Sequence, residues 1–406
     1  MPLPRSHINL PASDVLLAAS ALVCRPDSKA VDEFVRELGR FFQDEKVVAT
    51  ASGRDAFKLI LEGLEGEGGE IIFPAYTYHP MPVLAASYGL APKFADVDPA
   101  TWNVDPDRVE ELISPRTRAI VPTHFLGVPA DLDELRKLAD RHNLVLIEDC
   151  AHAFGSTYRG LPVGGCGEAG IFTFAMSKNM PCFGGGALRV SEPELLRRIQ
   201  ARLDEAGATP VLDIWKRQFG NVAAMLAGSR LFFVWTLYPL LRLADLCDSS
   251  AFDRKFTETV RPPSASFRSP GKRMAPLQAR IGCRQILRFP EYLERHVDRA
   301  LLLRRFLSRI EGLTIQELPP DRTSAFLSVR VRVDVPDEFR RRLRELGVDT
   351  RPDEMRNCAG LKVFSPSRSC PVAESLAGKC IEIPFRATHS DRSIEKLAGA
   401  VARALR

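Results

Sequence analysis

The sequence predicts an α/β fold with a large, mostly parallel sheet, and two features of its pattern support this. From about residue 44 to residue 190, short apolar runs alternate with stretches of helical spacing. This alternation is typical of βαβ units, whose parallel sheet is covered by helices on both faces. The last third of the chain instead carries one alternating run and two amphipathic stretches. We therefore expect a second, smaller α+β domain at the C-terminal end.

The expected elements follow from the spacing of the apolar residues. The β-branched run at 46–51 predicts a strand, and the apolar positions of 54–64 recur at helical spacing. The other expected strands of the large sheet are residues 70–73, 119–121, 144–147, 171–174 and 187–190, and the other helices are residues 81–88 and 132–142. In the smaller domain, residues 329–335 predict a half-buried strand, and residues 337–346 and 391–405 predict amphipathic helices.

Three parts of the chain can be expected from these elements. Residues 1–28 would form an N-terminal arm, residues 29–262 the large domain, and residues 263–406 the smaller one. Within the large domain, residues 208–262 interrupt the alternation with an apolar insert.

Composition excludes several classes of protein. The chain has 406 residues, of which 45% are hydrophobic and 26% charged, so a disordered or fibrous chain is excluded. The net charge is only +5 and the basic residues form no long patch, so we expect no nucleic-acid partner. The nine cysteines are scattered without a C-x-x-C pair, so we expect neither a metal site nor disulfides. Reduced thiols and the lack of a signal-peptide pattern predict a cytoplasmic protein.

Two candidate site segments follow the first expected strands, where ligands of such sheets bind. Ser52, Gly53 and Arg54 open a helix, and backbone N–H groups at a helix start suit a phosphate. A plain strand-to-helix turn is the alternative interpretation. Tyr78 follows the next strand, where an aromatic ring either stacks on a flat cofactor or belongs to the core.

Two further segments follow later strands and carry ionisable side chains. Asp149 ends a buried strand and His152 comes three residues later, although Asp149 could simply cap a helix. Lys178 follows Thr173 in TFAMSKN, flanked by apolar and small residues. Partial burial would lower the pKa of this lysine and make its amine nucleophilic. The order of phosphate turn, aromatic residue, strand-end Asp and Lys favours a functional site over four separate coincidences.

This order resembles pyridoxal-phosphate enzymes of the aspartate aminotransferase fold (fold type I), and specifically the DegT/DnrJ/EryC1/StrS family of sugar aminotransferases. The similar stretches are FPAYTYHPMPVLAASYGLAPKFADVDPATWNVDP (73–106), RTRAIVPTHFLGVPADLDEL (116–135), LVLIEDCAHAFGSTYRGLPVG (144–164), FTFAMSKN (172–179), RMAPLQARIG (273–282) and IEIPFRATHSDRSIEKL (381–397). They cover most of residues 30–200 and 270–406, and the pair IEDCAHAFG and TFAMSKN is specific.

The resemblance implies a role for each candidate residue. Lys178 would hold pyridoxal phosphate as a Schiff base, and Asp149 would keep the ring nitrogen protonated. His152 would hydrogen-bond the phenolic oxygen of the cofactor, and Tyr78 would stack on its ring. The phosphate would be held by Ser52, Gly53, Arg54 and Thr173.

The resemblance also implies the reaction, a ping-pong transfer of an amino group to a keto-sugar nucleotide, with glutamate as the donor by family resemblance. A lipid-linked or otherwise hydrophobic ketone is the alternative acceptor, and a non-catalytic cofactor-binding regulator is the alternative class. A homodimer is implied because related sites are built across the subunit interface. Two residues depart from the family pattern, since Arg54 replaces a Thr and Gly271 replaces an Asn that contacts the neighbouring subunit's phosphate.

The densest apolar part of the insert, residues 231–241, leaves three alternatives open. It packs within the protein or its dimer, lies on a membrane surface, or lines a site for a hydrophobic acceptor. A bilayer span is disfavoured because a helix needs roughly 20 residues to cross. Arg230 and Arg242 at its ends suit a surface-lying element, so residues 221–247 are the candidate for peripheral membrane contact. We expect packing, as a helical lid or interface element beside the active site.

Overall fold

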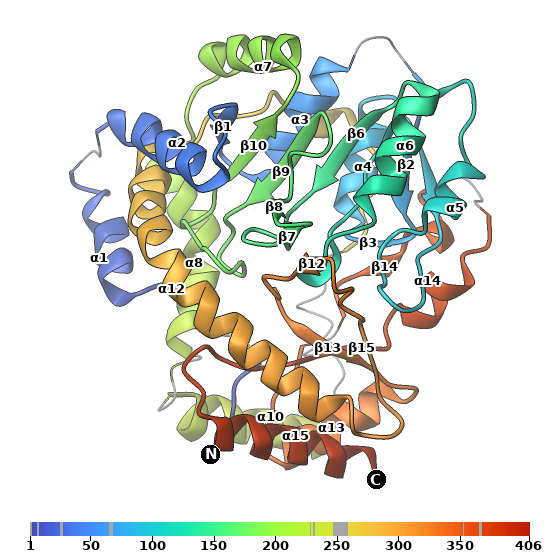
Figure 1. Ribbon diagram of the computed structural model, residues 1–406. Helices are drawn as coiled ribbons and strands as arrows, with labels where there is room; N and C mark the ends of the chain where they lie inside the picture. The colour runs from blue at the N-terminus through green and yellow to red at the C-terminus, as the bar shows by residue number, and fades with distance from the viewer. Residues whose placement is uncertain are drawn as a thin grey trace.

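The computed structural model has a seven-stranded sheet at its centre, with helices on both faces (Figure 1). The strand order is β1-β10-β9-β6-β5-β2-β4, and neighbouring strands are parallel except in the two pairs that β10 forms. A smaller antiparallel sheet, β11-β13-β15, lies in the C-terminal third. The predicted α/β class is therefore confirmed. The structure describes residues 2–5, 8–24, 27–64, 68–227, 229, 232–246, 259–351, 353–364 and 368–406.

The strands of the large sheet are β1 Val47–Thr50, β2 Glu70–Pro74, β4 Ala91–Ala95, β5 Thr117–Ile120, β6 Val145–Asp149, β9 Ala169–Thr173 and β10 Gly186–Val190. The smaller sheet contains β11 Thr314–Ile315, β13 Val329–Arg332 and β15 Cys380–Ile383. Short pairings involve β3 Tyr76–Thr77, β7 Thr157–Tyr158, β8 Leu161–Pro162, β12 Arg322–Thr323 and β14 Arg356–Asn357. Every strand expected from the sequence overlaps one of these, whereas β4 was not expected.

The helices are α1 Ala12–Ser20, α2 Lys29–Phe42, α3 Gly53–Gly63, α4 Pro80–Ser87, α5 Pro106–Glu110, α6 Leu132–His142, α7 Pro193–Glu205, α8 Val211–Ala227, α10 Tyr238–Leu246, α12 Pro276–Leu307, α13 Pro336–Glu345, α14 Pro371–Leu376 and α15 Asp391–Leu405. Short helical turns lie at η1 Phe125–Gly127, η2 Phe233–Leu237, η3 Ala265–Arg268 and η4 Cys358–Gly360.

Side chains of the large sheet alternate between its two faces, as the pleat of a strand requires. Ile71 and Phe73 of β2 join a core with α3, α4 and α7, whereas Ile72 between them joins a core with α5 and α6. In β9, Ile171 joins the core with α3, α4 and α7, whereas Phe172 lies on the opposite face and packs with α2 and α12. Because both faces are covered by apolar side chains, the strands appear in the sequence as continuous apolar runs.

Helix α12 connects the large sheet with the smaller one, because its 32 residues contribute to the cores of both. Phe289 in its first half packs with α2, and Leu303 in its second half packs with β13, β15 and α15. The N-terminal arm lies against the same helix. Buried Asp14 of α1 accepts hydrogen bonds from Arg284 (2.6 Å) and Arg288 (2.9 Å) of α12. The domain boundaries given above stay a prediction.

The apolar insert packs against the smaller domain. Phe233 and Leu241 are buried, and the Tyr238 hydroxyl donates to the backbone carbonyl of Arg344 in α13 (2.6 Å). The expected packing is confirmed for residues 232–246, where α10 contacts α13 (Figure 1). These residues do not line the large cavity at the sheet edge, so the expected position beside the active site is wrong for them, although Arg217 and Asn221 of the same insert do line it. Arg230 and Leu231 lie outside the described residues. Trp235 keeps 77% of its surface exposed.

Of the helices in the described part of the chain, none combines the length and hydropathy that a membrane crossing requires.

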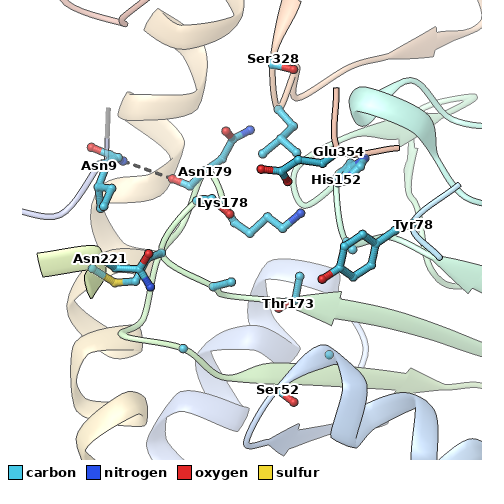
Figure 2. Close-up of a pocket in the computed structure, with 18 of the residues that line it drawn as sticks. Asn9, Ser52, Tyr78, His152, Thr173, Lys178, Asn179, Asn221, Ser328 and Glu354 are labelled. Atoms are coloured by element: carbon cyan, nitrogen blue, oxygen red, sulfur yellow. Dashed lines mark hydrogen bonds between the residues drawn. The ribbon is translucent and has the colours of Figure 1, made fainter. Parts of the chain in front are cut away.

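The carboxyl ends of several parallel strands open onto one large cavity of about 1140 Å³ (Figure 2). Tyr78 beyond β2, Asp149 at the end of β6 and Thr173 at the end of β9 all line it. This edge is where ligands of open α/β sheets bind. The fold therefore brings the candidate segments together as the order of strands predicted.

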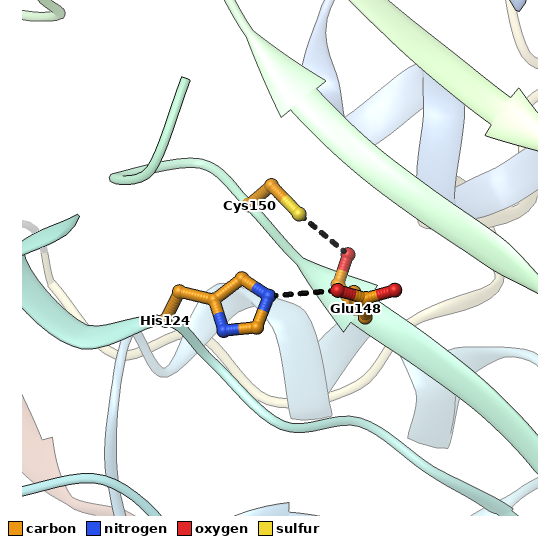
Figure 3. A group of neighbouring side chains, drawn as sticks. All are labelled: His124, Glu148 and Cys150. Carbon is orange, nitrogen blue, oxygen red and sulfur yellow. Dashed lines mark hydrogen bonds and ion pairs between the residues drawn. The ribbon is translucent and has the colours of Figure 1, made fainter. Parts of the chain in front are cut away.

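A buried carboxylate holds the end of β6 in place. The side chain of Glu148 accepts four hydrogen bonds, from His124 Nε2 (3.0 Å) and the backbone N–H groups of Gly164 (2.8 Å), Cys166 (2.7 Å) and Gly167 (2.9 Å). Figure 3 shows His124 hydrogen-bonded to this carboxylate and the Cys150 thiol directed at the backbone carbonyl of the same residue. Burial raises the pKa of Glu148, but these hydrogen bonds outweigh it, so that the pKa lies below its ordinary value of 4.5.

The three side chains in Figure 3 also have a spacing that could suit a metal ion. However, the N–H of Ala130 donates to His124 Nδ1 (3.0 Å), so the ring proton lies on Nε2 and donates to Glu148. The Cys150 thiol donates to the backbone carbonyl of Glu148 (3.7 Å). These hydrogen bonds engage the ligand atoms, and the cluster is explained as a structural anchor for Asp149, the next residue.

We expect Glu148→Gln to destabilise the fold, because the new NH₂ group would face N–H donors in a buried site. The free energy of unfolding should fall by about 2–4 kcal/mol at pH 7, measured by urea denaturation. The lowered folded-state pKa makes the carboxylate stabilising above pH 4.5, and this stabilisation is lost as the pH falls through the folded-state value. The difference in free energy of unfolding between Glu148→Gln and the unsubstituted protein should therefore become smaller at acidic pH.

The control for this substitution is Glu395→Gln, on the exposed face of α15, which should leave stability unchanged. If Glu148→Gln were as stable as the unsubstituted protein at pH 7, the anchoring role would be refuted.

Candidate active site

Lys178 lies in the loop that follows β9, and its amine points into the cavity (Figure 2). The side chain is half-buried, and protein atoms surround its amine on the sides away from the cavity. Burial lowers the pKa of Lys178 from 10.5 to about 8, although the negative charges of Asp149 and Glu354 oppose this shift. An appreciable fraction of such an amine is neutral, and therefore nucleophilic, near pH 7–8.

Asp149 is the last residue of β6, and its carboxyl group is buried at the cavity. The N–H of Ala151 donates to its Oδ1 (3.0 Å), which engages one of the two carboxylate oxygens. Burial raises the pKa of Asp149, while this hydrogen bond and the charge of Lys178 act in the opposite direction. A buried carboxylate in this position is stabilised by a cationic N–H partner.

His152 is neutral and presents a donor to the cavity. The N–H of Leu126 donates to its Nδ1 (3.3 Å), so the ring proton lies on Nε2. Burial, with added repulsion from Lys178 and Arg330, lowers the pKa of His152 well below 6.5. The side chain can therefore donate one hydrogen bond without carrying charge.

The N-terminus of α3 forms another wall of the cavity, where Ser52, Gly53 and Arg54 lie close to Thr173. The first N–H groups of a helix point out of this end and suit a phosphate. Gly53 leaves no room for a side chain, since a Cβ would lie 2.9 Å from the Cβ of Thr173. The Ser52 hydroxyl caps the helix, accepting from the N–H of Asp55 (3.1 Å) and donating to its carboxylate (2.6 Å).

Tyr78 completes the set, and Figure 2 shows its ring beside the end of the Lys178 side chain. All the residues predicted from the sequence line the one cavity, namely Ser52, Gly53, Arg54, Tyr78, Asp149, His152, Thr173 and Lys178. Their individual chemical roles stay predictions.

Several cavity residues were not predicted, because they come from segments without a readable motif. They are Asn9 of the arm, Asn221 of α8, Ser328, Arg330 of β13, Arg351 and Glu354. A hydrogen bond from the Asn9 side chain to the carbonyl of Asn179 (3.2 Å) ties the arm to the lysine loop. Nothing in the spacing of these residues marked them, since the smaller domain brings most of them to the cavity from far along the chain.

The structure explains why position 271 is a glycine. A Cβ at Gly271 would lie 2.6 Å from Cγ of Leu59 and 2.9 Å from the carbonyl oxygen of Asp55. The neighbouring Lys272 carbonyl accepts a hydrogen bond from the N–H of Ala51 (2.9 Å), so this segment packs tightly on the start of α3. The side-chain contact that the resemblance implied for the family Asn has no counterpart at this position.

Comparison with known proteins identifies the relatives of this chain. It is 29% identical over 366 residues to the erythromycin biosynthesis sensory transduction protein EryC1 of Saccharopolyspora erythraea, covering 89% of this chain and 85% of that protein. It is 40% identical over 172 residues to dTDP-3-amino-3,4,6-trideoxy-alpha-D-glucose transaminase of Streptomyces venezuelae, covering 42% of this chain and 45% of that enzyme.

Solved structures show the same fold. The aminotransferase TlmJ of Streptoalloteichus hindustanus superposes over 100% of this chain and 99% of its own, with a TM-score of 0.77 at 24% identity. The sequence profile of the DegT/DnrJ/EryC1/StrS aminotransferase family matches residues 23–231 and 244–402. The chain therefore belongs to the DegT/DnrJ/EryC1/StrS aminotransferase family, whose members are pyridoxal-phosphate-dependent enzymes of fold type I.

Proposed function

We propose that this pyridoxal-phosphate-dependent aminotransferase moves an amino group from glutamate to a keto-sugar nucleotide. The observation that carries the proposal is the amine of Lys178, whose pKa is lowered to about 8 in a cavity shared with Asp149 and the start of α3. Intact Lys178 and Asp149 also argue against a non-catalytic regulator.

The residues of the cavity fit the cofactor. The lysine amine suits its aldehyde, the buried Asp149 carboxylate suits a protonated ring nitrogen, and the neutral His152 suits its phenolic oxygen. The α3 N-terminus suits its phosphate, and Gly53 keeps that approach open because a side chain there would collide with Thr173.

The chain's own groups divide the chemistry between them. Pyridoxal phosphate, when bound, supplies an electron sink for the substrate carbon that bears the amino group. Lys178 would hold the cofactor covalently, and once released its amine would act as the base that moves a proton between that substrate carbon and the cofactor carbon that bore the aldehyde. Asp149 would keep the ring nitrogen protonated. His152 would donate a hydrogen bond to the phenolic oxygen, and Tyr78 would contact the ring.

The acceptor class is supported by the relatives and by the charge of the cavity wall. One relative is named as a transaminase of a dTDP-linked amino sugar. Arg217 of α8, Arg351 and Arg386 line the cavity, and arginine side chains suit a diphosphate. The hydrophobic-ketone alternative gains nothing from the apolar run, because the described residues 232–246 are not among those that line the cavity.

The experiment that tests the function separates the two half-reactions. Glutamate should convert the bound cofactor to its aminated form, seen as bleaching of its visible absorbance. A panel of nucleotide-linked keto-sugars should then restore the original spectrum. Restoration by hydrophobic ketones and by no keto-sugar would overturn the acceptor class.

We expect the active protein to be a cytoplasmic homodimer. The proposal rests on the family, in which the site is completed across the subunit interface. Light scattering at working concentration should give twice the chain mass of 45.1 kDa. A mass of one chain in the active holoenzyme would count against it.

We expect the amine of Lys178 to react at lower pH than an exposed lysine, because burial lowers its pKa to about 8. Below this pH the amine becomes protonated and unreactive, so acylation of the apo-protein should rise to half its maximal rate near pH 8. Peptide mapping measures this rate, with the exposed Lys396 in the same digest as reference. Borohydride reduction of the holoenzyme should attach the cofactor to Lys178, and attachment to another lysine would refute the assignment.

We expect Asp149→Asn to keep the shape of the site and lose the charge that holds the ring nitrogen protonated. The turnover number should fall by about 100- to 1000-fold while bound cofactor stays detectable by absorbance. Asp298→Asn, on the exposed face of α12, is the matched control and should keep full activity. Near-normal turnover of Asp149→Asn would be incompatible with the proposed role.

A further inference from the structure

The smaller domain inserts one short segment, residues 353–357, into the cavity wall beside Lys178. Its first residue, Asp353, is buried and accepts hydrogen bonds from Arg330 (2.8 Å), the Tyr76 hydroxyl (2.6 Å) and the N–H of Met355 (3.0 Å). Because an ion pair and two hydrogen bonds converge on this carboxylate, the backbone at Asp353 has a defined position.

The other end of the segment is attached to the large domain. Arg356 and Asn357 form β14, which pairs with Tyr76 and Thr77 of β3. The N–H of Cys358 then donates to the carbonyl of Ala75 (2.7 Å). The segment is therefore fixed on both sides of Glu354, next to the strand that leads to Tyr78.

Glu354 is the one residue between these anchors that turns an ionisable side chain to the cavity. Figure 2 shows its carboxylate near the Lys178 amine, on the side where Ser328 lies and away from Thr173 and Ser52. Its neighbours Asp353 and Met355 are buried, whereas Glu354 itself is exposed. In the part of the chain that the structure describes, no hydrogen bond or ion pair is assigned to this carboxylate, although its charge acts on Lys178.

The position of Glu354 defines what it can contact. The phosphate-binding end of the cavity is at Ser52 and Thr173, so the substrate must approach the lysine amine from the opposite side, where Glu354 lies. A carboxylate accepts hydrogen bonds and repels other anions. The cavity residues that suit anionic groups are arginines such as Arg217 and Arg386, so the cavity wall carries both signs of charge.

We propose that Glu354 is a specificity-determining residue that accepts a hydrogen bond from a hydroxyl group on the carbon next to the reacting carbonyl of the acceptor. This inference rests on the proposed keto-sugar function and deepens it. Glu354 distinguishes a polyhydroxylated ketone from a plain one, because only the former has a donor for this carboxylate. A donor amino acid offers carboxylates instead, and these gain nothing from Glu354.

The alternative is that Glu354 acts only through its charge on Lys178. That role would alter every substrate equally, because the same amine serves both half-reactions. A contact with one hydroxyl group would instead alter only the acceptors that carry it. The two roles can therefore be distinguished by whether substitution of Glu354 changes the preference between acceptors, and not by its effect on overall activity.

The test compares Glu354→Gln and Glu354→Ala with the unsubstituted holoenzyme. The probes are a thymidine-diphosphate-linked 4-keto-6-deoxyhexose and its 3-deoxy counterpart, which lacks the hydroxyl next to the carbonyl. For the hydroxylated acceptor, KM should rise about 10- to 100-fold in Glu354→Ala and less in Glu354→Gln, with kcat little changed. For the 3-deoxy acceptor and for glutamate, KM should change less than threefold.

Glu291→Gln is the matched control, since this carboxylate also lines the cavity but pairs with Arg295 (2.9 Å). It should leave the ratio of KM values between the two acceptors unchanged. Comparing two acceptors on the same preparation removes any effect of incomplete folding.

Equal changes for both acceptors in the Glu354 variants would overturn the inference and leave the proposed function intact. Failure of the unsubstituted enzyme to use either acceptor, with glutamate still bleaching the cofactor, would overturn the acceptor class and this inference with it.

Discussion

A lysine amine can remain neutral near physiological pH only if the protein keeps water from it without surrounding it with carboxylates. Lys178 meets this condition through opposing influences, since burial lowers its pKa while Asp149 and Glu354 raise it. Removing water from the amine weakens its ability to hold a proton, and the two carboxylates prevent the shift from going further. The balance between burial and the two negative charges depends on the distances of Asp149 and Glu354 from the amine. Both carboxylates must therefore be held at fixed positions.

Each carboxylate is held through a buried neighbour in the sequence. Asp149 follows Glu148, whose four hydrogen bonds tie β6 to His124 and to the loop at 164–167. Glu354 follows Asp353, which is fixed by Arg330 and Tyr76. In both pairs the first acid accepts several hydrogen bonds and has a structural role. The second acid faces the cavity. Adjacent acids on an extended backbone point in opposite directions, so one can anchor while the other acts.

The sequence predicted the large sheet well because both of its faces are buried and its strands are therefore continuous apolar runs. It missed β4, an edge strand whose residues Pro92 and Lys93 are partly exposed and break such a run. The eight candidate residues were found because they follow strands at one edge. Glu354 and Arg330 were not, because their place at the cavity depends on how the smaller domain docks, and that docking leaves no local pattern.

The two departures from the family pattern have a common structural basis. Gly271 packs so closely on α3 that any side chain would meet Leu59 or the backbone of Asp55, and both residues belong to the helix that begins at Gly53. Arg54 is in the first turn of that helix, and Lys58 lies one turn further on. Burial is the main cause that lowers the pKa of Lys58, and the positive charges of Arg54 and Lys272 lower it further. Arg54 and Lys58 both line the cavity, whereas Lys272 does not, and the negative charges of Asp55 and Glu62 lie close to Lys58 as well. A helix N-terminus favours anions, and a cation in its first turn strengthens this preference. The residue at 271 serves packing on α3, because no side chain fits there.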